Sequence, residues 1–369
     1  MKILLIDNAG LVCKNHRFYC VEGTGKFAAE LVELGADVTM FGQKVVMESC
    51  VSVFDIEAHG IKTAGLWRKK NKVMSYLGLY FNAIKYICKS DFVYIFYPNA
   101  FRFLAFICSL LGVKYGLYVR GDEGIEDRVS KRIYKRAAVV LTVSQMFTNM
   151  VNRVTNSNVA ENIRPMLSYD DSDVVYDHVY VSKDKYELLF LCRIQKAKGI
   201  LELMEALQRM KSNDAHTFHL TVAGDGDYLD EAKNECKKMG LENEVTFLGG
   251  VYDNKLKAEI YRKADLYVLP TYYNEGFPRT LYEAMIFGTP VLTTMVAGIA
   301  SLMKDKENCR ELAPHSVDSI VEVLTYAFNH YDEMGKLAKN GAKMVAKVVD
   351  RNRPSHARQL YQKIEQYGK

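Results

Sequence analysis

The chain has 369 residues, of which 49% are hydrophobic and 25% charged, and a formal net charge of +5. This length predicts two domains at about 100–200 residues each, and the composition is typical of a globular protein. So small a basic surplus does not indicate nucleic-acid binding, although it is compatible with phosphorylated substrates or an anionic membrane surface. The eight cysteines are scattered without a Cys-x-x-Cys pair, a pattern that favours idle thiols in a reducing cytoplasm over disulfides or a zinc site.

The N-terminus lacks the features of a secretory signal, because Met1-Lys2 leads straight into a short apolar run at residues 3–6. The longest apolar run, near residues 103–111, is too short for the roughly 18–20 residues of a transmembrane helix. We therefore expect a cytoplasmic protein.

Short apolar runs alternate with helical patterns along the whole chain. In the first half we expect helices at residues 26–34 and 76–88, and strands at residues 3–6, 38–41, 92–96, 115–119 and 139–143. A polar linker is expected at residues 169–185, after which the pattern restarts. The second half is expected to hold strands at residues 188–192, 219–222, 245–247, 266–269 and 291–293, and helices at residues 199–210, 227–239, 254–263, 280–287, 317–328 and 354–367.

This β-α-β rhythm predicts an α/β fold of two Rossmann-like domains facing across a cleft. We place the first domain at residues 1–168 and the second at residues 183–350. Ligands of such sheets bind at the carboxyl ends of the strands, so the chemistry is expected in the loops there.

The strongest chemical signal is the run Asn274-Glu275-Gly276-Phe277-Pro278-Arg279-Thr280-Leu281-Tyr282-Glu283, which follows a predicted strand and begins a helix. A glycine turn before a helix presents backbone N–H groups and the positive end of the helix dipole, which suit phosphate. Carboxylates at Glu275 and Glu283 suit the hydroxyls of a sugar or ribose. Spacing alone also allows an acidic N-cap followed by an ordinary helix glutamate.

Two further segments carry groups that could hold a phosphorylated ligand. Arg193 and Lys198 lie at a strand-to-helix turn, where two cations could neutralise a diphosphate, or could simply be solvated. Gly23, Thr24 and Gly25 follow a long loop and precede the first predicted helix. Glycines let a backbone approach a ligand closely, although a flexible loop would look the same, and the Walker pattern is absent.

Taken in order, these segments resemble the retaining GT-B glycosyltransferases of family 4, also called glycosyl transferases group 1. The resemblance covers about residues 188–313 and rests on Arg193 to Gly199, Val222-Ala223-Gly224-Asp225-Gly226, Val245-Thr246-Phe247-Leu248-Gly249, Ala264-Asp265-Leu266, the Glu275 and Glu283 pair, Gly288-Thr289-Pro290-Val291 and Ala297-Gly298-Ile299. The N-terminal half resembles the family more loosely. By the same resemblance, the last helix, within residues 351–369, would cross back to the first domain.

The resemblance implies a role for each matching residue. Glu275 would hold donor-sugar hydroxyls and Glu283 the ribose, while Arg193 and Lys198 would stabilise the departing diphosphate. Further contacts to the donor would come from Gly23, Thr24 and Gly25, from the backbone at Gly276, Phe277, Thr280 and Leu281, and from Gly249 and Tyr252 near the nucleobase. Asp225-Gly226-Asp227 matches a turn of the family, so we expect no metal there.

The implied activity is retaining, metal-independent transfer of a hexosyl group, with no cofactor, from a nucleotide diphosphate sugar such as a UDP-sugar to a glycan or lipid-linked glycan, as in surface polysaccharide synthesis. Many family members carry a histidine after the fourth strand of the first domain, where this chain has Arg120-Gly121-Asp122. Arginine stays protonated and is no base, so Arg120 could add positive charge, bind an anionic group or pair with Asp122.

Several alternatives stay open. A nucleotide-sugar epimerase of related fold would differ only in its product, and a non-catalytic subunit could keep the fold. A nicotinamide dehydrogenase is disfavoured because Gly-x-Gly-x-x-Gly is missing after the first strand. The basic segment at residues 67–72 and the cations from Arg128 to Arg136 could give peripheral contact with the inner face of an anionic membrane, or a merely solvated surface.

Overall fold

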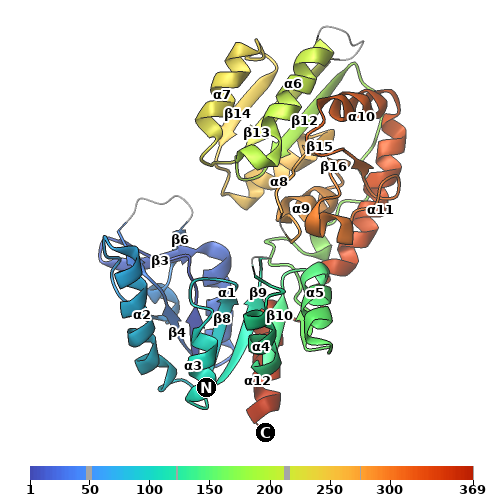
Figure 1. Cartoon of the computed structure of the whole chain (residues 1–369). Coiled ribbons are helices and arrows are strands. Elements are labelled where there is room, and N and C mark those ends of the chain that lie inside the picture. The colour runs from blue at the N-terminus through green and yellow to red at the C-terminus, as the bar shows by residue number, and fades with distance from the viewer. Residues whose placement is uncertain (47–51, 122–123, 212–216, 275, 369) are drawn as a thin grey trace. The chain divides into compact units, whose positions relative to one another are not determined.

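The computed structural model describes residues 1–46, 52–121, 124–211, 217–274 and 276–368. The chain divides into two compact units (Figure 1). Unit 1 comprises Met1–Met166 and Asn352–Lys369, and unit 2 comprises Leu167–Arg351.

Unit 1 is built on a parallel sheet of buried, apolar strands, as expected for a sheet covered on both faces. In the described part of the chain its order is β11 (Ala160–Asn162), β10 (Val139–Thr142), β9 (Lys114–Val119), β8 (Phe92–Tyr97), β1 (Lys2–Ile6), β4 (Asp37–Phe41) and β7 (Lys62–Ala64). The chain begins in the middle of the sheet and adds strands on both sides of β1, which is a doubly wound topology.

Helices cover both faces of this sheet. One buried cluster joins it to α2 (Lys72–Ile87), α3 (Leu104–Leu110), α4 (Arg128–Arg136) and α5 (Gln145–Thr155). A second cluster joins the opposite face to α1 (Glu22–Glu33) and α12 (His356–Gly368). The last helix therefore belongs to unit 1: the buried His356 ring lies 2.7 Å from the Tyr94 hydroxyl, and Ser355 donates to Glu30 at 2.5 Å.

Residues 11–21, predicted as part of a long loop, form a hairpin instead. They belong to a small sheet in the order β5 (Lys44–Val45), β2 (Leu11–Lys14), β3 (Arg17–Val21) and β6 (Ser52–Asp55). Successive side chains of a strand point to opposite faces of the sheet, but these strands are so short that no period of two stands out in the sequence.

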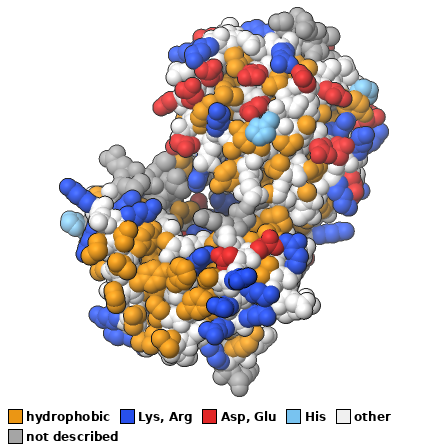
Figure 2. All heavy atoms as spheres, in the orientation of Figure 1, with side chains coloured by type: hydrophobic (Ala, Val, Ile, Leu, Met, Phe, Trp, Pro, Cys, Tyr) orange, Lys and Arg blue, Asp and Glu red, His pale blue; other side chains and the backbone are white. Residues whose placement is uncertain are grey.

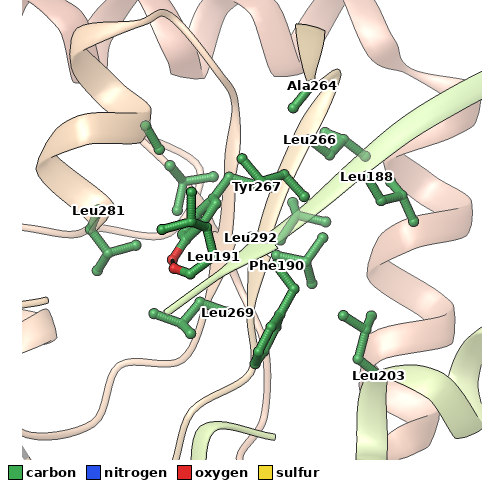
Figure 3. Close-up of a cluster of buried hydrophobic side chains, with 14 of the residues drawn as sticks. Leu188, Phe190, Leu191, Leu203, Ala264, Leu266, Tyr267, Leu269, Leu281 and Leu292 are labelled. Atoms are coloured by element: carbon green, nitrogen blue, oxygen red, sulfur yellow. Dashed lines mark hydrogen bonds between the residues drawn. The ribbon is translucent and has the colours of Figure 1, made fainter. Parts of the chain in front are cut away.

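Unit 2 repeats the doubly wound plan. Its sheet has the order β14 (Val245–Gly249), β13 (Thr217–Ala223), β12 (Lys185–Leu191), β15 (Leu266–Leu269), β16 (Val291–Thr293) and β17 (Arg310–Glu311) over the residues described. The helices are α6 (Ile200–Lys211), α7 (Leu229–Lys238), α8 (Asn254–Lys263), α9 (Arg279–Ile286), α10 (Val317–Asn329) and α11 (Tyr331–Val348). Figure 3 shows part of the core, where Leu191, Tyr267 and Leu269 from the central strands lie on the side of Leu281 of α9.

The segment predicted as a linker, residues 169–185, packs on unit 2. The Tyr169 hydroxyl donates to the Asn254 carbonyl at 2.6 Å, Val175 N–H to Ile286 at 2.7 Å, and the Tyr180 hydroxyl to Gly288 at 2.6 Å. Its tyrosines are therefore anchors, and the second unit begins at Leu167 rather than at residue 183.

The predicted α/β class and the two Rossmann-like domains are confirmed. The sequence did not predict helices α3, α4 and α5 of unit 1, or helix α11, which lies between the predicted helices of residues 317–328 and 354–367. Among the helices that the structure describes, none combines the length and apolar character needed to cross a bilayer.

Candidate functional site

The central strands of unit 2 define where a ligand would bind. The sheet order reverses between β12 and β15, because β13 lies on one side of β12 and β15 on the other. In open parallel sheets, ligands bind outside the carboxyl ends of the strands at such a reversal. The loop after β12 holds Arg193 and Lys198, and the loop after β15 holds Asn274 and residues 276–278, so these predicted site residues converge on this point.

Backbone contacts fix these two loops against each other. Tyr272 N–H donates to the Ala197 carbonyl at 2.9 Å, and the Tyr272 hydroxyl donates to Lys196 at 3.0 Å. Gly199 has a φ of +80°, and a Cβ there would lie 2.2 Å from the Pro270 carbonyl oxygen. Glycine is thus required at this crossing, and the turn that carries Lys198 is rigidly placed.

The two predicted cations differ in their surroundings. Lys198 ends a short 3₁₀ turn, Lys196–Lys198, and is 6% exposed, whereas Arg193 is exposed. The Lys198 ammonium lies 4.8 Å from the centre of the Tyr273 ring. Lys198 thus places a largely buried cation at the carboxyl edge of the sheet, where a lysine can contact phosphate as a point charge.

The turn before α9 is held by a close approach of two backbones. Gly276 is buried, and a Cβ on Gly298, in the 3₁₀ turn Ala297–Ser301, would lie 1.0 Å from the Gly276 carbonyl oxygen. Glu275 lies outside the described residues. The N-cap of α9 is Pro278, so the alternative of an acidic N-cap at this helix is wrong.

The remaining predicted residues of this segment lie in or beside the first turn of α9. Phe277 is buried against Tyr282, with ring centres 4.3 Å apart, and the Thr280 hydroxyl oxygen accepts from the Tyr267 hydroxyl at 2.7 Å. Leu281 is fully buried, and its N–H donates to the Pro278 carbonyl at 3.1 Å. The first N–H groups of a helix have no intrahelical acceptor. The backbone N–H of Thr280 is therefore better placed for phosphate than that of Leu281, which already donates to Pro278.

Glu283 is 7% exposed and belongs to a buried polar group that the sequence did not reveal. Its Oε2 accepts from the Tyr261 hydroxyl at 3.1 Å, and its Oε1 lies 3.8 Å from the Lys257 ammonium. Burial raises the pKa of Glu283, while Lys257 and the tyrosine hydrogen bond oppose that rise. Tyr261 and Lys257 both come from α8, whose spacing gave no hint that it faces this glutamate.

The segment predicted to approach the nucleobase follows β14. Gly249 ends this strand and its carbonyl accepts from Gly224 N–H at 2.7 Å, which ties the loops after β13 and β14 together. Tyr252 is exposed beyond that point. Its ring is therefore accessible at the carboxyl edge of the sheet. It follows β14, which is separated from β15 by β13 and β12.

Gly23, Thr24 and Gly25 do not lie in a loop, as predicted, but in the first turn of α1. A Cβ on Gly25 would lie 2.2 Å from ring atoms of Phe54 in β6, so this glycine makes room for an aromatic side chain. This contact could not be predicted because the sequence did not indicate β6, and a glycine pair before a helical pattern is typical of a loop.

Arg120 follows β9 at the carboxyl edge of the unit 1 sheet. It pairs with Asp7, which follows β1, at 2.6 Å, and its guanidinium lies 4.9 Å from the centre of the Phe96 ring. Asp122, the alternative partner, lies outside the described residues. Asp7 was not singled out from the sequence, although its place directly after the first strand could have identified it.

Unit 2 is similar to a known protein family. The family model of glycosyl transferases group 1 matches residues 178–344. This stretch lies within unit 2 and contains both loops at the sheet reversal, α8 and α9.

Two curated relatives match longer stretches of the chain than the family model does. An uncharacterized glycosyltransferase of Methanocaldococcus jannaschii is 28% identical over 248 residues, 64% of this chain and 60% of that protein. A putative teichuronic acid biosynthesis glycosyltransferase of Bacillus subtilis is 25% identical over 228 residues, 60% of this chain and 54% of that protein. The chain thus spans less than two thirds of the length of these relatives.

Among solved structures, Anabaena HepE in complex with UDP and glucose superposes with a TM-score of 0.71 at 16% identity, over 100% of this chain and 99% of that chain. At this identity the likeness shows the fold alone, which is the GT-B fold of glycosyltransferases. Unit 2 therefore matches glycosyl transferases group 1, and the two units together have the GT-B fold.

Proposed function

We propose that the chain is a retaining glycosyltransferase that moves a hexosyl group from a nucleotide diphosphate sugar, with a UDP-sugar as donor, to a glycan or lipid-linked glycan. The observation that carries this proposal is that Lys198 and the glycine turn before α9 lie on two adjoining loops at the sheet reversal of unit 2, with buried Glu283 in the helix that follows. The match of residues 178–344 to glycosyl transferases group 1 supports it.

The diphosphate is assigned to the cations and the helix end. Lys198 and Arg193 lie in the loop after β12, and the first turn of α9 offers N–H groups and the positive end of its dipole. Charge grows on the diphosphate as the sugar leaves, and fixed positive groups stabilise that state more than the ground state. These groups do the work that a metal ion does elsewhere, so the proposed reaction is metal-independent.

The nucleoside is assigned to the neighbouring side chains. The Glu283 carboxylate accepts hydrogen bonds from the ribose hydroxyls at Oε1, since Oε2 already accepts from Tyr261. The base lies near Gly249 and Tyr252 on the same edge. UDP in the HepE structure supports uridine as the nucleoside.

The sugar hydroxyls are assigned to Glu275. Retention at the anomeric carbon follows from a front-face displacement in which the leaving phosphate takes the acceptor proton, so no protein base is needed. Arg120, which cannot serve as a base, is assigned to binding an anionic group at the carboxyl edge of unit 1. The B. subtilis relative is named for teichuronic acid biosynthesis, which supports a glycan as the acceptor.

A screen of UDP-, GDP- and ADP-sugars by thermal shift and by donor hydrolysis, with EDTA present, tests the proposal. We expect a shift and turnover with a UDP-sugar, and loss of both in Lys198→Ala. Anomer analysis of the transferred sugar by NMR then reports retention or inversion. Interconverted donors without transfer would identify an epimerase, and a shift without turnover on any acceptor would identify a non-catalytic subunit.

A further inference from the structure

Helix α2 of unit 1 is apolar on two sides. Leu79, Ala83 and Ile87 are fully buried against the sheet. On its outer side, Val73 and Phe81 are 68% and 75% exposed. A helix that is apolar nearly all round is normally buried on all sides, so the outer side of α2 requires an explanation.

The exposed apolar residues continue beyond α2. Val73, Leu77 and Phe81 recur every four residues and so form one stripe along the helix, which spans about 24 Å for its 16 residues. Neighbouring α3 adds Leu110, which is 86% exposed, and Leu111 just after it. Figure 2 shows the hydrophobic side chains gathered over the part of unit 1 where Figure 1 labels α2 and α3.

Positive charge surrounds this apolar surface. Residues 61–160 contain 16 Lys and Arg against five Asp and Glu, a net charge of +11, whereas the whole chain carries +5, so the other 269 residues carry −6. The exposed cations lie before and on α2 and along α4, which packs beside α3: Arg68, Lys69, Lys70, Lys72, Lys85, Arg128, Lys131, Arg132, Lys135 and Arg136. The surface is thus an apolar strip with a cationic border.

We propose that the outer layer of α2, α3 and α4 is a docking surface for an anionic lipid bilayer. Apolar side chains of α2 and α3 enter the boundary between headgroups and acyl chains, and the lysines and arginines contact anionic headgroups. The charge decides between occupants, because a second copy would bring the same +11 against itself, whereas an anionic bilayer complements it. This inference does not rest on the proposed reaction, since it uses none of the site residues of unit 2.

Co-sedimentation of the full chain with vesicles tests the surface. We expect binding to phosphatidylcholine vesicles that contain phosphatidylglycerol at low salt, and loss of binding at about 1 M NaCl, where the Debye length is about 3 Å. Binding to pure phosphatidylcholine at equal strength, or no binding to the anionic vesicles, would overturn the proposal. Sedimentation velocity without lipid must give a monomer; a dimer that Phe81→Glu dissociates would assign the apolar surface to self-association instead.

Charge reversal identifies the border of the surface. Lys131→Glu/Lys135→Glu on α4 should weaken binding more than ten-fold, because each Lys near an anionic surface contributes about five-fold. The matched control is Lys233→Glu/Lys237→Glu, an exposed pair with the same spacing on α7 of unit 2, which should leave binding within about two-fold apart from the general change in net charge. Equal losses in both pairs would overturn the assignment to α4.

The apolar strip is tested in the same way. Leu77→Glu/Phe81→Glu should reduce binding at least ten-fold, since insertion of a single Leu or Phe side chain contributes about ten-fold or more. Val179→Glu/Val181→Glu, both exposed in unit 2, matches it in charge and should bind nearly as the wild type. Thermal melts should be unchanged in both variants because all four side chains are exposed; unchanged binding of the α2 variant would refute insertion.

Discussion

Replacing Glu283 by glutamine separates the structural role of this side chain from its proposed role in binding the ribose. The amide keeps the shape of the carboxylate and can still accept from the Tyr261 hydroxyl, which lies 3.1 Å from Oε2. It loses the charge that faces Lys257 and that would accept the ribose hydroxyls. UDP binding should therefore weaken, whereas stability without nucleotide should not fall.

The expected loss of UDP affinity follows from the hydrogen bonds involved. A hydrogen bond to a charged group contributes about 1.5–3 kcal/mol and a neutral one about 0.5–1.5 kcal/mol. For two ribose hydroxyls, the exchange of carboxylate for amide should cost about 1–3 kcal/mol, or roughly 5- to 150-fold in Kd.

Stability in the absence of nucleotide should be unchanged or higher. Burial raises the pKa of Glu283, so the folded protein binds this proton more tightly than the unfolded chain does. The resulting contribution to stability is present at low pH and is lost as pH rises through the raised pKa, so at pH 7 the carboxylate disfavours folding. Glutamine removes this effect, and for the same reason UDP binding to the wild type should weaken as pH falls toward that pKa.

Calorimetric titration with UDP and thermal melts without nucleotide measure the two effects. Glu259→Gln, at an exposed position of α8, is the matched control and should change neither. A lower melting temperature with unchanged UDP affinity would refute the reasoning and make Glu283 a structural partner of Tyr261.

Three further substitutions test the packing that holds the site and unit 1. Gly298→Ala should push the Gly276 turn aside, with a UDP affinity at least ten-fold weaker and a free energy of unfolding lower by about 1–3 kcal/mol; unchanged titrations would show that the two turns are not coupled. Gly25→Ala should lower the free energy of unfolding of unit 1 by a similar amount in urea, without weakening UDP binding. Adding Phe54→Leu should restore part of the lost stability. Weaker UDP binding would instead support a contact between this turn and phosphate. Burial lowers the pKa of His356 to about 3, so this residue's contribution to the free energy of unfolding should be complete above pH 6.5 and should fall by about 1.4 kcal/mol per pH unit below it. Urea unfolding from pH 7 to pH 4 should therefore show a smaller fall in the free energy of unfolding for His356→Gln than for the wild type. An equal dependence on pH in both proteins would contradict this.

The main sheets could be predicted from the sequence because their strands are continuous apolar runs. Residues 266–269 and 291–293 were placed as observed and the other predicted strands within a few residues, whereas the short edge strands β7, β11 and β17 were not predicted. The hairpin of residues 11–21 could not be predicted, since short strands in a small sheet lack a period that distinguishes them from a loop. Helix α11 was missed although its buried residues, such as Tyr331 and Met334, recur at helical spacing.

The site was predictable where it depends on loops after strands and not where it depends on tertiary neighbours. Lys198 and Gly276 follow β12 and β15, and topology alone brings such loops together. Tyr261 and Lys257 meet Glu283 only because α8 packs beside α9, which no local pattern encodes. The misplacement of Gly25 has the same cause, because the partner that requires glycine there, Phe54, comes from a strand far along the chain.

In the proposed function, a nucleoside diphosphate binds at the sheet reversal of unit 2, against the buried Lys198. Calorimetric titration of UDP into Lys198→Ala and into Lys196→Ala tests it most directly, because the two lysines share one short turn but only the first is buried. We expect equal UDP affinity in the wild type and in Lys196→Ala, and a loss of about 10- to 100-fold in Lys198→Ala, as expected for a charge-assisted hydrogen bond to phosphate. Equal affinities in all three proteins would contradict it.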